Sequence, residues 1–240
     1  VITVGLGFVG GWFAPLFSLP LAWMLGSLFM VMGLSLMGVK TGVDKRVHRT
    51  AIALLGLFIG SRIQADELVG LVLWYPSVLA MLVYMGLMLI GGFWIFNRAR
   101  VGRMNAIFCS YPGSMNSALV LAERANGDLR WIAISHSLRL VTVVSGAAFV
   151  ASFFVDDVAL ASSPSALALV DILPLLLAPL CWWLARLLRI PLPEFLGPMA
   201  AGAIIANLGF DYSLPTGVVL AAFLVLGASV GSRFSGTQWS

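Results

Sequence analysis

The sequence predicts an all-α integral membrane protein with about eight transmembrane helices, one broken re-entrant segment and an inverted-topology internal repeat. Three observations predict this fold class. Hydrophobic residues make up 60% of the 240 residues and charged residues only 10%, with a mean hydropathy of +1.01. A soluble domain carries about 25% charged residues, so this chain cannot cover itself with a polar surface. Long apolar runs recur along the chain, and one stretch of sequence returns in its second half.

The apolar runs are long enough, or nearly so, to cross a bilayer as helices, since a helical span needs roughly 20 residues. Polar connectors separate the runs, and none of the runs alternates as a barrel strand does. The pattern predicts helices over 1–17, 20–38, 47–63, 71–96, 104–122, 131–154, 168–188, 191–208 and 215–234.

The repeat is visible as an ungapped alignment of 12–62 with 183–233, which gives 15 identities in 51 positions. Seven of the 15 identities fall on Gly, Pro, Trp and Arg, more than biased aliphatic composition would give, which favours duplication. The matching motifs are LPLAWMLG (19–26) with IPLPEFLG (190–197), and LGLFIGSRI (55–63) with LGASVGSRF (226–234). Equivalent positions differ by 171 in residue number, which is the period of the repeat.

The period of 171 predicts a parent of about 340 residues, twice the repeat length, so the second repeat is expected to be incomplete in this chain. The chain also begins at Val1 without Met, which suggests a start inside a helix. The predicted organisation is a first membrane repeat over 1–154, a connector over 155–167 and a partial second membrane repeat over 168–240.

The orientation of the repeats is predicted from Lys and Arg, which favour the cytoplasmic side of a membrane. The 40–49 connector holds four basic residues, whereas its repeat partner, 211–220, holds none. Conversely, Arg186 and Arg189 flank a connector whose partner near 18–19 is neutral. The two copies therefore carry opposite charge bias, which predicts inverted topology. Inversion requires an odd number of crossings per period, so one of six segments must fail to cross.

The segment 104–122 is the candidate for re-entry, because Pro112-Gly113 breaks it. Half-helix ends at membrane depth bind ions and carboxylates in secondary transporters. Non-helical backbone is tolerated there only against protein or a wet cavity, so a structural kink between packed helices is the alternative. Ser114 is a candidate cap for the helix after the break. The predicted substrate-binding residues of this segment are Pro112, Gly113, Ser114, Asn116 and Ser117.

His136 and Arg139 are the other predicted substrate-binding residues. Arg139 follows Trp131 by eight residues, about 12 Å along a helix. An arginine at that depth must face protein or water, and His136 shares its face at a spacing of three. The pair could contact an anion or relay a proton, or it could hold the carbonyls that the break frees. Both interpretations are open from the sequence.

Four glycines predict close helix packing. Gly56 and Gly60 in the first copy, and Gly227 and Gly231 in the second, form small-residue faces of the kind that let membrane helices approach closely.

Enzyme chemistry is not expected. An oxygenase needs several converging metal ligands, and the only histidines, His48 and His136, lie on different segments. The sequence contains no nucleophile elbow, phosphate loop or haem motif, so we expect no catalytic residue, metal or cofactor. The net charge of +4 is small and does not indicate nucleic-acid binding.

The motifs PLAWMLGSL and PLPEFLGPM, the paired GxxxGSR endings and the stretch AIFCSYPGSMNSALVLAERANGDLRWIAISHSLRL resemble the AbrB membrane protein family. The resemblance covers nearly the whole chain. The family carries the descriptions "ammonia monooxygenase" and "regulator", and it shares only its name with a soluble DNA-binding regulator. Family members usually have Pro-Gly-Gly, a small residue and then Glu-Met at the break. Asn116 replaces the acidic residue here, so a carboxylate role is not expected at this position.

The predicted function is a secondary transporter or permease for a small solute, with an organic anion favoured by Arg139 and the half-helix ends. The alternatives are a membrane sensor or regulator that affects gene expression, as the family name implies, and a non-functional fragment. Monooxygenase activity is not expected. The expected partners are the lipid bilayer and the solute, homo-oligomerisation is left open, and the resemblance implies a multi-pass protein of the bacterial inner membrane.

Overall fold

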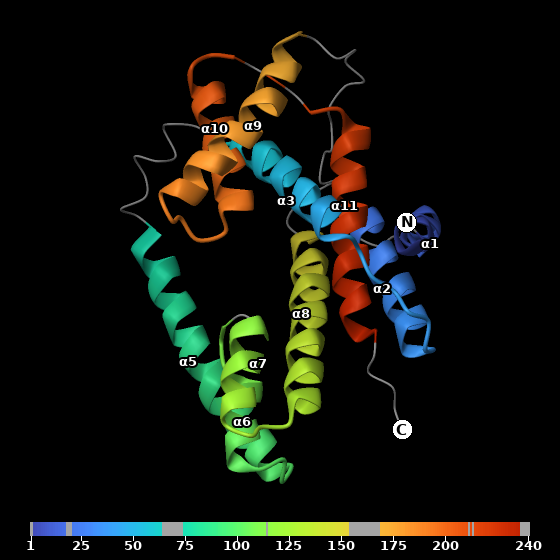
Figure 1. Cartoon of the computed structure of the whole chain (residues 1–240), viewed down its shortest axis with the longest axis vertical. Coiled ribbons are helices and arrows are strands. Elements are labelled where there is room, and N and C mark those ends of the chain that lie inside the picture. Colours follow the sequence, from blue (N-terminus) through green and yellow to red (C-terminus); the bar gives the residue numbers. More distant parts are fainter. Residues whose placement is uncertain are drawn as a thin grey trace. The chain divides into compact units, whose positions relative to one another are not determined.

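The structure is a computed structural model of the chain, and it describes residues 2–17, 21–63, 74–113, 115–153, 169–210, 212 and 214–235. All secondary structure within these ranges is helical (Figure 1). The helices are α1 (Ile2–Phe13), η1 (Ala14–Phe17), α2 (Ala22–Leu36), α3 (Lys45–Gly60), α5 (Tyr75–Arg98), α6 (Arg103–Ser110), α7 (Met115–Arg124), α8 (Leu129–Ala151), α9 (Leu169–Leu187), α10 (Pro193–Asn207), α11 (Thr216–Gly231) and η3 (Ser232–Phe234).

Each predicted apolar segment contains a helix, and local signals explain several of the boundaries. The Asp44 carboxylate caps α3 by accepting the Arg46 backbone N–H at 2.7 Å. Pro76 occupies the first turn of α5, where a missing N–H costs nothing. The segment predicted to be broken, 104–122, forms two helices, α6 and α7.

Three helices of the described chain are long and apolar enough to cross a membrane: α5, α8 and α11 continued to Phe234. This finding agrees with a membrane location. The helices α2, α3 and α10 contain only 15, 16 and 15 residues, fewer than the roughly 20 of an ordinary span. The predicted eight crossings therefore do not follow from helix length.

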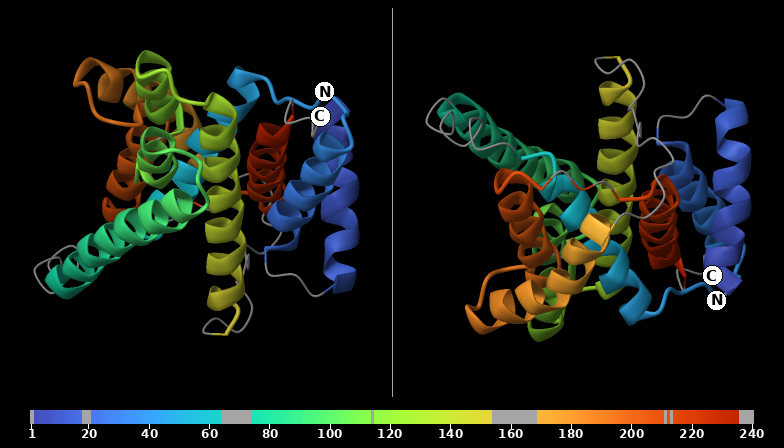
Figure 2. Two further views of the ribbon diagram at one scale, coloured as in Figure 1. Left: turned by 90° about the horizontal axis from the view of Figure 1, so that it is seen from below. Right: turned by 90° about the horizontal axis from the view of Figure 1, so that it is seen from above.

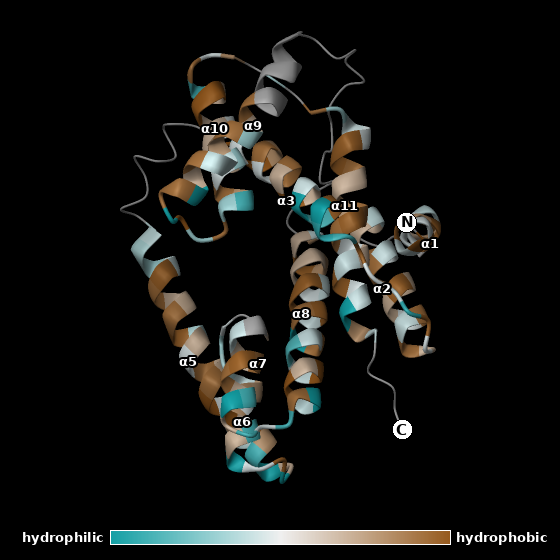
Figure 3. Cartoon of the chain, viewed as in Figure 1, coloured by the Kyte–Doolittle hydropathy of each residue, from teal (hydrophilic) through white to brown (hydrophobic). Residues whose placement is uncertain are grey.

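Among the three candidate membrane spans, α5 has the highest mean hydropathy, and it is hydrophobic along most of its length (Figure 3). None of its side chains is buried. α6 packs on one side of α5, and the rest of the helix exposes a long apolar surface that would be unfavourable in water. This surface is compatible with a membrane location.

The described chain divides into two compact units. One contains α1, α2, α3, α9, α10, α11 and the last residues of α8, and the other contains α5, α6, α7 and most of α8. The predicted repeat boundaries are different, because they describe similarity of sequence rather than compactness. The predicted connector 155–167 lies among residues that the structure does not describe.

Within the first unit, local structure repeats with the sequence period of 171. The bounds of α2 and α10 differ by 171 at both ends, and so do those of α3 and α11. Leu21 and Leu192 precede α2 and α10 with left-handed φ values of 48° and 50°. Gly38 and Gly209 follow the same helices with φ values of 89° and 86°, a conformation that glycine adopts without strain. The two sequence copies therefore adopt the same local structure.

The helices of the two copies exchange partners. In the first copy α1 packs on α2, and in the second α9 packs on α10. Between the copies α2 packs on α11, and α3 packs on α10. In Figure 2, α11 lies beside α1 and α2 in both views. Each copy therefore completes the core of the other, which explains why both fall in one compact unit.

The predicted small-residue faces lie at these exchanged contacts. A Cβ atom on Gly56 would lie 2.5 Å from the Phe195 carbonyl oxygen of α10, and one on Gly60 would collide with the Met199 carbonyl. The same contacts recur one period later: Gly227 lies against the Met24 carbonyl and Gly231 against the Leu28 carbonyl. At these four positions no side chain fits, because the obstacle is backbone of the neighbouring helix.

Candidate functional site

The candidate site lies in the second unit, where the chain breaks between α6 and α7. Pro112 has no backbone N–H, so the Phe108 carbonyl loses the donor that a continuous helix would supply. Tyr111 is extended, with φ −56° and ψ 120°, as expected before a proline. Gly113 donates its N–H to the Tyr111 carbonyl at 2.9 Å instead of continuing the helix. The break therefore leaves several carbonyls that need donors from elsewhere.

Side chains of α8 meet these carbonyls. The Ser135 hydroxyl donates to the Cys109 carbonyl at 3.1 Å. The His136 Nε2 atom lies 3.0 Å from the Phe108 carbonyl oxygen. Since a carbonyl can only accept, Nε2 carries the proton of the imidazole. His136 is only 4% exposed, so this bond is shielded from solvent.

Arg139 completes the contact between α8 and the break. Its Nη1 donates to the Tyr111 carbonyl at 2.9 Å, and its Nη2 donates to the Gly113 carbonyl at 3.2 Å. Nη2 also lies 3.0 Å from His136 Nδ1, which accepts because Nε2 holds the proton. The predicted juxtaposition of the break with the face that carries His136 and Arg139 is present in the structure.

Three local features position the start of α8. The Asn105 side-chain oxygen accepts the Asp128 N–H at 2.8 Å, which ties the start of α8 to α6. The Asp128 carboxylate accepts the Arg130 N–H at 2.9 Å and so caps α8. Asn126, with φ 53°, turns the chain between α7 and α8, and Gly127 donates to the Ala122 carbonyl at 2.8 Å. This short turn brings positions 135–139 back to the break.

The electrostatic character of the site comes from Arg139. Its guanidinium is half-buried, and no carboxylate of the described residues lies within ion-pair distance of it. Its neighbours are carbonyl dipoles and a neutral imidazole, which orient the cation without neutralising its charge. The N-terminus of α7 adds a partial positive charge on the far side of the break. The arrangement therefore favours a negatively charged ligand.

The other predicted site residues lie around the same break. Pro112 and Gly113 form the break itself and are half-buried. Asn116 and Ser117 belong to the first turn of α7, where Ser117 is exposed. Ser114 lies outside the described residues.

Two residues of this site were not predicted from the sequence. The Ser135 hydroxyl donates to the freed carbonyl of Cys109. Its spacing of four residues from Arg139 in the sequence indicates that both side chains lie on the same face of α8. Gly92 of α5 lies against Ser110, since a Cβ there would be 3.1 Å from the Ser110 hydroxyl oxygen. The Gly91-Gly92 pair inside an apolar run was the signal for this close approach.

Comparisons with known proteins give the family but not the mechanism. The whole chain, residues 1–240, matches the family AbrB, described as transition state regulatory protein AbrB. A relative from Escherichia coli (strain K12), named "Putative regulator AbrB", is 26% identical over 226 residues. The alignment covers 90% of this chain and 64% of the relative, so the chain spans less than two thirds of that protein's length. No solved structure matches the chain. Since the family match extends over all 240 residues, the chain belongs to the AbrB family.

Proposed function

We propose that this protein is a secondary transporter or permease that binds a small organic anion at the break between α6 and α7. The observation that carries the proposal is the half-buried, uncompensated cation of Arg139, held on the broken backbone by the Tyr111 and Gly113 carbonyls. Broken helices at a substrate site are typical of secondary transporters. The proposal assigns no catalytic reaction to the chain.

In the proposed site, Arg139 and the first turn of α7 contact the anion from two sides. Two of the five guanidinium N–H groups remain after the bonds to Tyr111, Gly113 and His136, so Arg139 retains donors for a ligand. Both ring nitrogens of His136 are engaged with protein atoms. We therefore assign His136 the role of positioning Arg139. Asn116 keeps its predicted role, a polar contact with the bound anion.

The proposal includes the predicted inverted topology, with about eight crossings and α6–α7 as a re-entrant segment in a bacterial inner membrane. The exchange of helix partners between the two copies, together with their opposite Lys and Arg bias, supports it. Inverted repeats allow alternating access in secondary transporters, because equivalent contacts can form toward either side of the membrane.

The inverted topology predicts that Lys45 and Thr216, which are equivalent positions of the two copies, lie on opposite faces of the membrane. Single cysteines at the two positions, in a background without Cys109 and Cys181, are expected to react with an impermeant maleimide from opposite sides of oriented vesicles. Labelling of both positions from the same side would rule out inversion. A cysteine in place of Lys40, in the same connector as Lys45, is the control and must label from the Lys45 side.

The names of the family and of the Escherichia coli relative favour a second function, regulation of gene expression. A membrane sensor would need the anion site to alter contacts with a partner rather than to move the solute. Uptake into vesicles that contain only this protein separates the two functions, because a sensor binds the anion without accumulating it inside.

The transport proposal predicts that Asn116→Ala lowers anion uptake about tenfold, as expected for loss of one hydrogen bond to a charged ligand. The variant protein is expected to keep its melting temperature. The measurement is uptake of a panel of labelled carboxylates and their neutral amides into proteoliposomes. Asn97→Ala, an exposed amide in the last turn of α5, is the matched control and should transport normally. Wild-type rates in Asn116→Ala would remove this residue from the site.

A further inference from the structure

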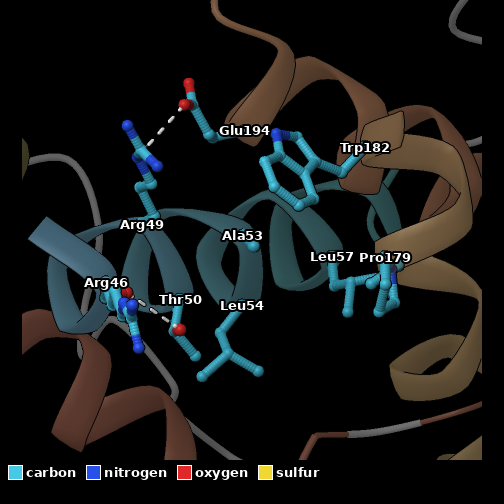
Figure 4. A pocket seen from close by; sticks show the side chains of 10 residues that line it. Arg46, Arg49, Thr50, Ala53, Leu54, Leu57, Pro179, Trp182 and Glu194 are labelled. Carbon is cyan, nitrogen blue, oxygen red and sulfur yellow. Dashed lines mark hydrogen bonds and ion pairs between the residues drawn. The ribbon is translucent and has the colours of Figure 1, made fainter. Parts of the chain in front are cut away.

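A second site lies in the first unit, apart from the break. The helices α3, α9 and α10 enclose a pocket of about 480 Å³ (Figure 4). This volume lies within the range of small-molecule sites. Alkyl side chains, among them Leu54, Leu57 and Pro179, form most of its wall, whereas Arg49 and Glu194 lie together at one edge. The pocket therefore combines an apolar interior with a charged entrance.

The entrance carries net positive charge and a free donor. Arg49 Nε lies 3.4 Å from Glu194 Oε1, a pair with an exposed arginine and a half-buried carboxylate that contributes little to stability. Arg46 also lines the pocket, and no carboxylate of the described residues pairs with it. The Trp182 indole N–H is shielded from solvent and has no hydrogen-bond partner among the described residues. Two guanidinium groups, which extend to different sides of α3 (Figure 4), and one indole N–H are therefore available to an anionic group.

The other sequence copy shows that the pocket is not a general consequence of this fold. At the equivalent positions of the first copy, Gly11 corresponds to Trp182, Trp23 to Glu194 and Phe8 to Pro179. The ring of Trp23 lies on Gly11, where an added Cβ would be 2.8 Å from it, and its centroid lies 5.4 Å from that of Phe8. The side chain of Trp23 therefore fills the volume that corresponds to the pocket.

The two arginines of the pocket are also absent from the equivalent place in the repeat. Leu220 and Gly217 of α11 correspond to Arg49 and Arg46 of α3. Each of the two places is built from both copies: the pocket has two arginines, a carboxylate and an indole N–H, where the equivalent place at α1, α2 and α11 has leucine, tryptophan and glycines. A packing defect alone would not bring cations and a free donor to the entrance of an apolar pocket.

We propose that this pocket binds an anionic phospholipid, with its phosphate at Arg46 and Arg49 and an acyl chain along Leu54 and Pro179. Arginine binds phosphate oxygens in a bidentate manner, and the Trp182 N–H offers a further donor. The basic connector 40–49, from which α3 starts, is predicted to be cytoplasmic, the side on which anionic lipids attract basic residues. The inference does not depend on transport.

Native mass spectrometry of the full chain in mild detergent tests the proposal. Phosphatidylglycerol is expected to remain bound at least about fivefold better than phosphatidylcholine with the same acyl chains. Arg46→Gln with Arg49→Gln should lower phosphatidylglycerol retention by about twentyfold, since each arginine near an anionic headgroup contributes roughly fivefold. Arg98→Gln with Arg100→Gln removes two basic residues of the other unit and should leave retention unchanged. Equal retention of the two lipids, or equal loss in both double variants, would overturn the proposal.

A second pair of variants tests the pocket itself. Trp182→Gly with Glu194→Trp installs the residue pair of the first copy, which should fill the pocket and abolish retention while the protein still melts cooperatively. Glu194→Gln removes the carboxylate that competes with phosphate for Arg49 and should increase retention. If the filled variant retains phosphatidylglycerol, the lipid lies elsewhere. If oleate binds this pocket and phosphatidylglycerol does not, the ligand is a free amphiphilic anion and the phospholipid proposal is wrong.

Discussion

Replacing Arg139 with leucine is expected to reduce anion uptake at least about a hundredfold and to destabilise the contact between α8 and the break. Loss of a charged hydrogen-bond donor from a half-buried site costs about 1.5–3 kcal/mol per ligand contact, which corresponds to a factor of ten or more for each. The same change removes the donors of the Tyr111 and Gly113 carbonyls. The measurements are uptake into proteoliposomes and thermal unfolding in detergent.

Two further substitutions separate the charge of Arg139 from its role in the fold. Arg139→Gln retains an amide donor for one carbonyl but has no charge, so it should fold and fail to transport. Arg139→Lys keeps the charge but not the planar fork, so it should transport better than Arg139→Gln despite lower stability. Arg130→Leu, an exposed arginine in the first turn of the same helix, is the control and should behave as wild type. Normal uptake by Arg139→Gln would show that Arg139 only locks the break.

Gly60→Leu and Gly231→Leu are each expected to prevent assembly of the first unit. A Cβ atom on Gly231 would lie 2.6 Å from the Leu28 carbonyl oxygen, and Gly60 lies closer still to the Met199 carbonyl. Overpacking a core costs about 1–3 kcal/mol when side chains can move, and a larger cost is expected here because the obstacle is helix backbone. Thermal unfolding and size-exclusion chromatography in detergent measure the effect.

The control for the glycine substitutions lies in the same unit. Gly33 of α2 has nothing within 4 Å of an added Cβ, so Gly33→Leu should assemble normally. Gly60→Ala and Gly231→Ala introduce only a methyl group and should already lower the melting temperature. Stable assembly of both leucine variants would mean that α3 and α10, or α2 and α11, do not approach as closely as the structure shows.

The sequence by itself determined the positions of the helices and of the break. Apolar runs bounded by polar connectors predicted every helical segment of the described chain, and Pro112-Gly113 predicted where 104–122 divides. The period of 171 read from the sequence also recurs in the helix bounds, as with α2 and α10. These features depend on local rules, because proline removes a donor and glycine permits left-handed backbone wherever they occur in a chain.

Only the tertiary structure decided which helices pack together and how the polar groups of the break are satisfied. The sequence left open whether Arg139 holds the freed carbonyls, and the structure gives it the carbonyls of Tyr111 and Gly113 as well as His136 Nδ1. It also paired α3 with α10 and α2 with α11, which no local pattern specifies. The pocket that Trp182 lines depends on the same packing, since equivalent positions in the two copies differ in volume and charge. Such contacts join residues far apart in the chain. Which helices pair depends on how well their whole surfaces pack together, and no short stretch of sequence specifies this.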